Sequence, residues 1–551
     1  MNTSPKFRPL IKKLLPEYLT LIILALFLCL SANLRFFQKV LDIYPWASNQ
    51  GFICSLVLLL FACLLFFAAL FSVVLSVRVT AVIFLLVAAA SAHFSDSFGT
   101  VIDSDMLRNV LETNVAESAD LLNPSLVLRL LLLGFLPSLF IWRFSASGIG
   151  FISSALKNGL TSIIALGIAA ACIAGFSSQY ASFFREHKPV RYYINPAYPI
   201  YSAINLGASF IPKGPPRPFQ ALQAQANIVE EQEAHSELII LVIGETARAD
   251  HFSLNGYERE TNPQLAKQDR LISYSNTQSC GTATAISVPC MFSYSTHANF
   301  DLKSARNTEN GLDLLKSAGV NVLWRDNNSD SKGVADRVEY ENFRSPELNP
   351  ICDSECRDIG MLEGLQEYVD GHSGDTLIVL HQMGSHGPAY FARYPKEFEK
   401  FTPSCRSAEL SECSQQEVTN AYDNTILYTD YFLSQVIRFL ESNSSRYETA
   451  MFYVSDHGES LGESGIYLHG MPYGFAPRAQ THVPVLAWVG ASSDIDYEQS
   501  KLLKDTANTH DAVFDTLMTI FEVTTSLLPT SAAQLVILKP EEEEEVASVP
   551  H

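Results

Sequence analysis

Long apolar runs, separated by short polar segments, dominate the first third of the chain. They cover residues 18–34, 52–76, 79–94, 125–142 and 159–178. Four of the five approach or exceed the length that an α-helix needs to cross a bilayer. The third is shorter, but it follows the second after only Arg78, as in a tight helical hairpin. The pattern predicts an all-α transmembrane bundle of five helices over residues 1–180, and the later runs argue against a cleaved signal peptide.

Basic residues between the runs give the bundle an orientation. They lie before the first run, at Arg78 between the second and third, and in the 143–157 loop with Arg143 and Lys157. Loops rich in Lys and Arg stay in the cytoplasm. Five crossings then place everything after residue 180 outside the cytoplasm.

From residue 237 the pattern changes to short β-branched runs that alternate with helical segments. Such runs are typical of buried parallel strands, so we expect an α/β domain over residues 237–538. Polar residues follow each run at the end where α/β sheets place ligand sites. The runs 238–243, 320–324, 376–380 and 451–455 lead into Glu245, Asn328, His386 and the pair Asp456-His457.

Glu245, Asp456 and His457 should therefore converge at one sheet edge. Two carboxylates and an imidazole suit a divalent ion, zinc first, with a coordination position left open. The sequence thus predicts a metal centre at this edge.

Three other segments complete the organisation. Residues 181–236 are rich in tyrosine and proline and are predicted to be an interfacial linker, and residues 539–551 an acidic disordered tail. The predicted periplasmic loop 95–124 is longer than a connector needs. Within it, Asn109, Thr113 and Glu117 would form one polar stripe on a helix. That stripe is either a solvated face or a surface for a lipid head group.

Charge and cysteine content restrict the function further. The formal net charge is -20, which disfavours nucleic acid as a partner. Six of the ten cysteines fall in close pairs: Cys280 and Cys290, Cys352 and Cys356, Cys405 and Cys413. Paired cysteines favour disulfides in an oxidising compartment over the alternative, a zinc site, because the chain has no CxxC pair.

Thr284 lies among small residues between Cys280 and Cys290, where a ligand can approach the backbone. If it opens a helix, the free amide groups there favour a bound anion. Its hydroxyl becomes a nucleophile once a metal or base takes its proton. The alternative is an ordinary N-cap or loop threonine.

His386, His469 and Lys332 are further candidates for chemistry. Both histidines lie in glycine-containing loops and could protonate a leaving group, bind a phosphate oxygen or hold a second zinc ion. Lys332 could neutralise phosphate charge. The alternative for all three is a surface residue without a role in catalysis.

Four longer motifs carry a resemblance to a known family. They are Ile243-Gly-Glu-Thr-Ala-Arg-Ala-Asp250, Cys280-Gly-Thr-Ala-Thr284, Ser455-Asp-His-Gly-Glu-Ser-Leu-Gly-Glu463 and His469-Gly-Met-Pro-Tyr473. They resemble the phosphoethanolamine transferases, and within them the lipid A-modifying branch that includes the mobile colistin resistance enzymes. The likeness covers essentially the whole chain. The Cys352–Cys356 loop is shorter than in those mobile enzymes, which leaves open whether this is a chromosomal relative.

The resemblance implies a fold similar to alkaline phosphatases and sulfatases for the globular domain. It implies zinc on Glu245, Thr284, Asp456 and His457, with Thr284 as the phosphoryl acceptor; we expect one ion, with a second as an option during turnover. It places Asn328, Lys332, His386 and His469 around the transferred phosphate, and Asn109, Thr113 and Glu117 at the phosphoethanolamine group.

The implied function is transfer of phosphoethanolamine from phosphatidylethanolamine to a lipid A phosphate through a Thr284 intermediate, conferring polymyxin and colistin resistance. The implied setting is a monomer in the bacterial inner membrane, with its catalytic domain in the periplasm. Alternatives are the same transfer onto a core sugar (Kdo or heptose) or a periplasmic glucan, a membrane phosphodiesterase or sulfatase, and a receptor or scaffold without activity.

Overall fold

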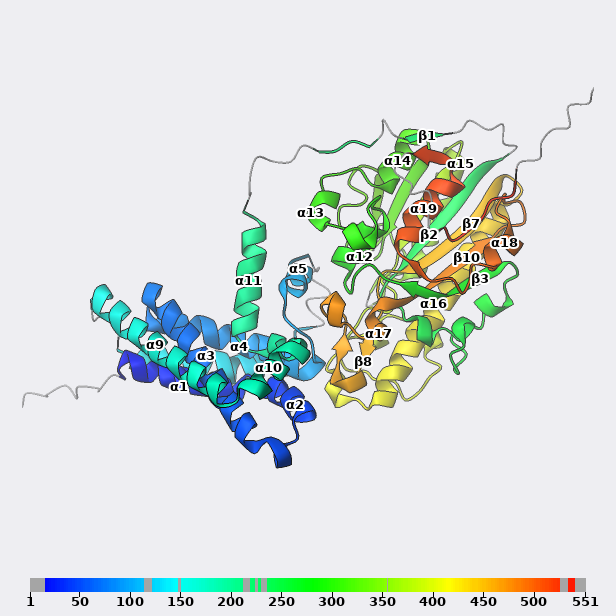
Figure 1. Ribbon diagram of the computed structural model, residues 1–551. Helices are drawn as coiled ribbons and strands as arrows, with labels where there is room; N and C mark the ends of the chain where they lie inside the picture. Colours follow the sequence, from blue (N-terminus) through cyan, green and yellow to red (C-terminus); the bar gives the residue numbers. More distant parts are fainter. Residues whose placement is uncertain are drawn as a thin grey trace, which may run out of the picture. The chain divides into compact units, whose positions relative to one another are not determined.

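The structure is a computed structural model of the chain (Figure 1). It describes residues 15–112, 121–146, 150–211, 219–222, 226–228, 235–353, 355–525 and 534–540. The chain divides into two compact units, one formed by residues up to Leu107 together with Leu122–Ile211, the other by Arg108–Leu121 and everything from Pro212. Each unit is described by itself.

The first unit is built from helices. Their bounds are α1 (Glu17–Ser31), α2 (Leu34–Ile43), α3 (Trp46–Val74), α4 (Val77–Phe98), α5 (Ser104–Glu112), α7 (Pro124–Arg129), η1 (Leu130–Phe135), α8 (Leu136–Phe144), α9 (Phe151–Gly175), α10 (Ser177–Glu186), η2 (Lys188–Tyr193) and α11 (Ala197–Ser209). Among the described residues, four helical stretches are long and apolar enough to cross a membrane, and the number is five if α1 and α2, which are bent by 58°, count as one broken span. The predicted all-α transmembrane bundle is confirmed, with four or five spans.

The third span is longer than its apolar run predicts. α4 begins after Ser76, whose Oγ accepts a hydrogen bond from the Val79 amide, and it ends at Gly99, which has a φ of 69°. The polar residues Ser91, His93 and Ser95 lie inside this helix and are buried within the bundle. The apolar run stops at residue 94 because Ser95 is polar, although its side chain is buried and α4 continues to Phe98.

Helices also occupy the first part of the segment predicted to be a linker. α10, η2 and α11 carry the chain to Ser209 as part of the first unit. Tyr180, Phe183 and Tyr193 are buried, and the Tyr193 hydroxyl donates to the Gly99 carbonyl at 2.8 Å. Of the tyrosines in the predicted linker, Tyr193 therefore packs in the core of the bundle, whereas Tyr201 is 62% exposed.

An ion pair joins α4 to α7. The Arg129 guanidinium binds the Asp96 carboxylate and also donates to the Ala92 carbonyl at 2.8 Å. The two charged side chains are 19% and 17% exposed. We expect Arg129→Met to lower the free energy of unfolding of the detergent-solubilised protein by about 2 kcal/mol, because it leaves a largely buried carboxylate without its cation.

Thermal melting would show this as a lower Tm. The matched control is Arg185→Met, which removes a cation whose side chain is 80% exposed beside Glu186 and should leave the Tm unchanged. Equal melting temperatures for the two variants would contradict the structural role of the Arg129 pair.

The second unit contains an eight-stranded sheet in the order β11-β3-β10-β7-β2-β6-β4-β5. The strands are β2 (Ser236–Gly244), β3 (Leu271–Gln278), β4 (Asn321–Asp326), β5 (Glu339–Asn342), β6 (Thr376–His381), β7 (Tyr447–Ser455), β10 (His482–Val489) and β11 (Asn508–Thr509). Two small sheets pair β1 (Ala226–Ile228) with β12 (Val523–Thr525) and β8 (Ser460–Leu461) with β9 (Tyr467–Leu468).

Helices cover the large sheet on both faces (Figure 1). They are α12 (Thr284–Met291), α13 (Leu302–Ala305), α14 (Gly311–Ala318), α15 (Leu365–Gly371), α16 (Gln415–Asn443), α17 (Arg478–Thr481), α18 (Tyr497–Lys501) and α19 (Asp511–Ile520). Ile239, Leu241 and Ile243 of β2 pack into one core with residues of α12, α14 and α19, while α16 packs on β7 from the other face. Burial on both faces explains why the strand runs are continuously apolar.

The sheet register places the polar strand ends together. β2, β4, β6 and β7 run parallel, with Gly244 opposite Ser455 and Ile243 opposite His381. Asp326 at the end of β4 is also opposite His381. All four strands therefore end at the same edge, as their sequences predict.

Candidate functional site

Glu245, Thr284, Asp456 and His457 meet at this edge. The Thr284 hydroxyl oxygen lies 3.1 Å from Glu245 Oε2 and 3.4 Å from His457 Nε2. His457 Nε2 is 3.4 Å from Glu245 Oε1 and 3.3 Å from Asp456 Oδ2. All four side chains are buried. The structure thus brings together the whole predicted ligand set.

The chemistry of this group fits a divalent metal ion. The ligand atoms of Glu245, Asp456 and His457 lie within 4.8 Å of one another. Asp456 Oδ2 is buried and accepts no hydrogen bond from the described residues. Burial lowers the pKa of His457, but the Asp456 and Glu245 carboxylates outweigh burial and raise it. Buried carboxylate oxygens without donors are costly unless a cation neutralises them, and carboxylates with imidazole suit zinc.

Backbone and amide donors hold the two carboxylates in place. Asp456 Oδ1 accepts from the amides of Thr246 and His457, at 3.2 and 2.7 Å. The Asn328 side chain donates to Glu245 Oε2 and to a backbone carbonyl, both at 2.7 Å. Asn328 was predicted to bind substrate; here it fixes the orientation of a candidate metal ligand.

Thr284 is the first residue of α12, and Ala283 is the N-cap. An alanine cap offers no side-chain acceptor, so the first amides of the helix keep their capacity to bind an anion. A disulfide between Cys280 and Cys290 closes the loop around this helix. The alternative of an N-cap threonine is therefore wrong, because position 284 lies inside the helix with its hydroxyl toward the metal ligands.

A second polar group adjoins the first. His469 Nδ1 lies 2.8 Å from Glu459 Oε2, and the Tyr390 hydroxyl donates to Glu459 Oε1 at 2.7 Å. The His469 ring centre is 4.3 Å from that of His457 and 5.6 Å from that of His386. His457, Glu459 and His469 also hold ligand atoms within 4.8 Å of one another. The sequence analysis missed Glu459 and Tyr390.

Burial sets the protonation of this group. It lowers the pKa of His469 to about 3 and that of His386 to about 4, and it raises the pKa of Glu459 to about 8. Both imidazoles are consequently neutral at pH 7. A neutral ring nitrogen can accept a proton or bind a metal ion.

The structure describes Lys332 and, of the predicted polar stripe, only Asn109. Lys332 follows Asn328 in the loop after β4, is buried, and donates from Nζ to the Ser329 carbonyl at 2.9 Å. Asn109 lies in α5, whereas Thr113 and Glu117 lie outside the described residues. The predicted roles of these four residues at the substrate stay predictions.

All three predicted disulfides are present: Cys280–Cys290, Cys352–Cys356 and Cys405–Cys413. The second closes a small ring that contains Glu355, and Glu355 forms an ion pair with Arg393. Arg393, whose side chain is 2% exposed, also donates from Nε to the His386 carbonyl at 2.7 Å. The ring therefore anchors the loop that carries His386.

We expect Arg393→Gln to lower kcat about 10-fold with little change in KM, because small displacements of a catalytic group cost rate rather than binding. Steady-state transfer from a fluorescent donor lipid would measure both constants. The control is Arg406→Gln, which removes a guanidinium that is 58% exposed and paired with Glu399. A rise in KM alone would argue against positioning of His386.

Two family models match the chain, one over each unit. The model described as "Phosphoethanolamine transferase EptA/EptB" matches residues 59–209, and the model described as "Sulfatase" matches residues 237–523. The second match confirms the predicted sulfatase-like fold of the α/β domain.

Known relatives are similar over nearly the whole length. Phosphatidylethanolamine transferase Mcr-2 of Escherichia coli is 45% identical over 526 residues, which cover 93% of this chain and 96% of the relative. Phosphoethanolamine transferase EptA of Escherichia coli K12 is 38% identical over 514 residues, 92% of this chain and 94% of the relative. The integral membrane lipooligosaccharide phosphoethanolamine transferase A of Neisseria meningitidis superposes with a TM-score of 0.90 at 32% identity, covering 95% and 99% of the two chains.

Proposed function

The chain belongs to the phosphoethanolamine transferase family, and we propose that it transfers phosphoethanolamine from phosphatidylethanolamine to a lipid A phosphate through a covalent intermediate on Thr284. It is an enzyme of the bacterial inner membrane with its catalytic domain in the periplasm. One observation carries the proposal. Thr284 is the first residue of α12, and its hydroxyl lies 3.1 Å from Glu245 Oε2 within a buried set of candidate metal ligands.

Glu245, Thr284, Asp456 and His457 would hold one zinc ion, which when bound supplies Lewis acidity that lowers the pKa of a coordinated hydroxyl. His457, Glu459 and His469 offer ligands for a second ion during turnover. The remaining chemistry belongs to the residues of this chain.

In the first half-reaction, the Thr284 oxygen attacks phosphorus and the bond from phosphorus to the diacylglycerol oxygen breaks. A neutral imidazole, His386 or His469, takes the hydroxyl proton and gives it to the departing oxygen. The first amides of α12 and the Lys332 ammonium neutralise the charge on the phosphoryl oxygens. Phosphoethanolamine is then esterified to Thr284.

In the second half-reaction, an oxygen of the lipid A phosphate attacks the same phosphorus and the bond to Thr284 breaks. The monoanionic lipid A phosphate gives its proton to the neutral imidazole, and the ring passes that proton to the departing threonine oxygen. The product carries an added ammonium group. A less anionic lipid attracts cationic peptides more weakly, which accounts for the proposed polymyxin and colistin resistance.

Mass spectrometry of lipid A and of core sugars from an expressing strain tests the proposal. We expect lipid A to gain the mass of phosphoethanolamine with the wild-type protein and not with Thr284→Ala. Modification of Kdo, heptose or a glucan instead of lipid A would reassign the acceptor. Release of diacylglycerol with no modified acceptor would favour a phosphodiesterase.

A further inference from the structure

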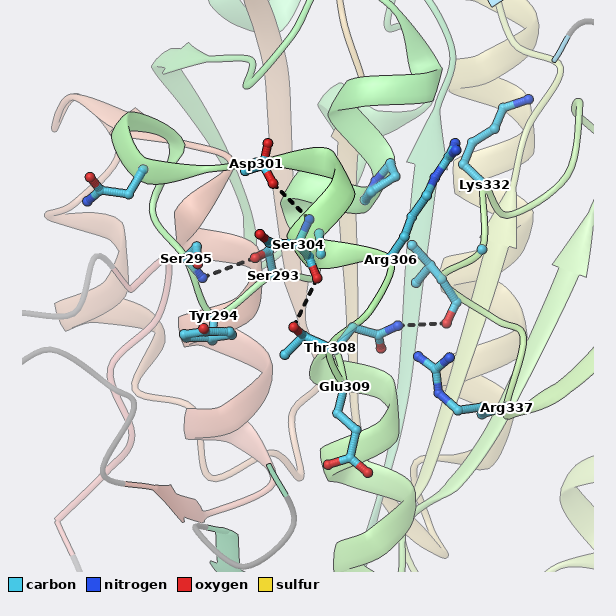
Figure 2. Close-up of a pocket in the computed structure, with 16 residues that line it drawn as sticks. Ser293, Tyr294, Ser295, Asp301, Ser304, Arg306, Thr308, Glu309, Lys332 and Arg337 are labelled. Carbon is cyan, nitrogen blue, oxygen red and sulfur yellow. Dashed lines mark hydrogen bonds between the residues drawn. The ribbon is translucent and has the colours of Figure 1, made fainter. Parts of the chain in front are cut away.

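The catalytic domain contains a cavity of about 200 Å³ next to α12 (Figure 2). Its walls come from Pro289 of α12, the segment 293–310 and the segment 332–337. None of these residues belongs to the metal-binding group described above. One of them, Lys332, also takes part in the proposed chemistry, so the cavity adjoins the reaction centre.

Two elements of the cavity wall also build the catalytic centre. α12 begins with the nucleophile Thr284, and Pro289 lies five residues further on, a rise of about 7.5 Å along the helix axis. The loop after β4 supplies Asn328, which holds Glu245, and then Lys332, which lines the cavity. The cavity wall at Pro289 thus lies about 7.5 Å along the helix axis from the position of the nucleophile.

The wall chemistry suits a polyhydroxylated ring. Ser293, Tyr294, Ser295 and Thr308 line it. The Ser293 hydroxyl accepts from the Ser295 amide at 3.1 Å and the Thr308 hydroxyl donates to the Ser304 carbonyl at 2.9 Å, and each oxygen keeps further hydrogen-bonding capacity. Sugar hydroxyls both donate and accept hydrogen bonds, so a wall with hydroxyl groups matches them, and an aromatic ring packs on the C–H face of a sugar.

Cations give the cavity a preference for an anionic group on that ring. Arg306 and Lys332 both line it, and Figure 2 shows the two side chains on the same side of the cavity. The Lys332 ammonium also lies 3.7 Å from Asp330 Oδ1, and Arg337, the third cation, is paired with Asp313 at 2.6 Å. A guanidinium beside an ammonium is a common arrangement for phosphate, which guanidinium binds through two parallel hydrogen bonds.

We propose that this cavity is the acceptor subsite and that it binds a phosphorylated sugar ring, with the phosphate beside Arg306 and Lys332 and the ring against the hydroxyl-lined wall. The inference rests on the proposed function, since the sugar it fits is the phosphorylated hexosamine of lipid A. According to this proposal, the catalytic domain recognises the sugar phosphate of the acceptor, and recognition does not depend on the acyl chains of the lipid alone.

The two half-reactions separate acceptor binding from chemistry on Thr284. In full-length enzyme without acceptor, Arg306→Gln should form the Thr284 adduct from phosphatidylethanolamine at a rate within twofold of wild type. With lipid A present, we expect its KM for lipid A to rise about 10-fold, the size of one lost charge-assisted hydrogen bond. Arg438→Gln removes an exposed cation on α16 and should change neither step.

A second variant tests the ring site without changing charge. Ala305 lines the cavity, and Ala305→Phe fills it. This variant should also raise the KM for lipid A and leave adduct formation unchanged. Glucosamine 1-phosphate should compete with lipid A in the wild type better than inorganic phosphate does, and this advantage should vanish in Ala305→Phe.

The outcomes are distinguishable. An unchanged KM in both variants, or equal inhibition by inorganic phosphate and glucosamine 1-phosphate, would overturn the acceptor subsite while leaving the proposed function intact. Slower adduct formation in both variants would reassign the cavity to the donor and likewise overturn it. Failure of the wild type to form any adduct would overturn the proposed function, and the subsite with it.

Discussion

Thr284→Ala should leave a folded protein whose kcat for transfer is lower by at least about 10⁴-fold, because loss of a nucleophile removes the covalent route altogether. The Thr284 oxygen is held 3.1 Å from Glu245 and 3.4 Å from His457, and the hydroxyl of this residue is the candidate nucleophile in contact with both ligands. Intact-mass analysis after incubation with phosphatidylethanolamine should show the phosphoethanolamine adduct on wild type and none on the variant.

The matched control is Thr449→Ala. Thr449 is also a fully buried threonine, and it lies in β7 on the same sheet. Its loss should cost stability without preventing adduct formation. Thr284→Ser, which restores a hydroxyl, should recover part of the adduct signal. An adduct of undiminished yield on Thr284→Ala would refute the assignment of the nucleophile.

The positions of the candidate metal ligands were predictable from sequence because each follows a strand that is buried on both faces. Such strands stand out as short β-branched runs, and parallel neighbours end at the same edge. Glu245, Asp456 and His457 could therefore be placed together before any coordinates. Thr284 needed the family resemblance as well, since no strand leads directly into it.

The residues that contact and orient the candidate catalytic side chains could not be predicted in this way. Tyr390 and Glu459 are 69 residues apart and meet through loops whose paths have no hydrophobic periodicity. The contact between Arg393 and the His386 carbonyl likewise depends on a turn rather than on an element. Hydropathy also ended the third span early, at residue 94, because the buried Ser95 of α4 is polar. Sequence patterns report burial along regular elements, whereas the contacts of Glu459 and of the His386 loop form between irregular ones.

Removal of the metal ion should abolish transfer and lower the Tm of the wild-type protein. Without a cation, the buried carboxylates of Glu245 and Asp456 repel each other, and Asp456 Oδ2 has no hydrogen-bond donor among the described residues. An ion that binds only the folded state stabilises it by mass action. Chelator treatment followed by thermal melting measures the loss, and added zinc should restore both the Tm and transfer.

The variant Asp456→Asn tests whether the effect of metal removal depends on the negative charge of Asp456. The variant should lose metal affinity by about 100-fold or more and lose transfer, because a ligand carboxylate becomes a neutral amide. In the presence of chelator, however, it should melt no lower than the wild type, since one of two facing buried charges has been removed. The order of the two melting temperatures should therefore reverse between zinc-loaded and chelated protein.

Asp430→Asn provides the control for that reversal. Asp430 is another buried aspartate, and it accepts two backbone amides at 2.9 Å, from Gln264 and Leu265, away from the metal ligands. Its substitution should leave metal content unchanged and should lower or raise the Tm equally with and without chelator. If Asp456→Asn behaved in the same way, the Asp456 carboxylate would be a hydrogen-bond acceptor with a structural role and not a metal ligand. Its buried Oδ2 atom would then need a partner other than a metal ion.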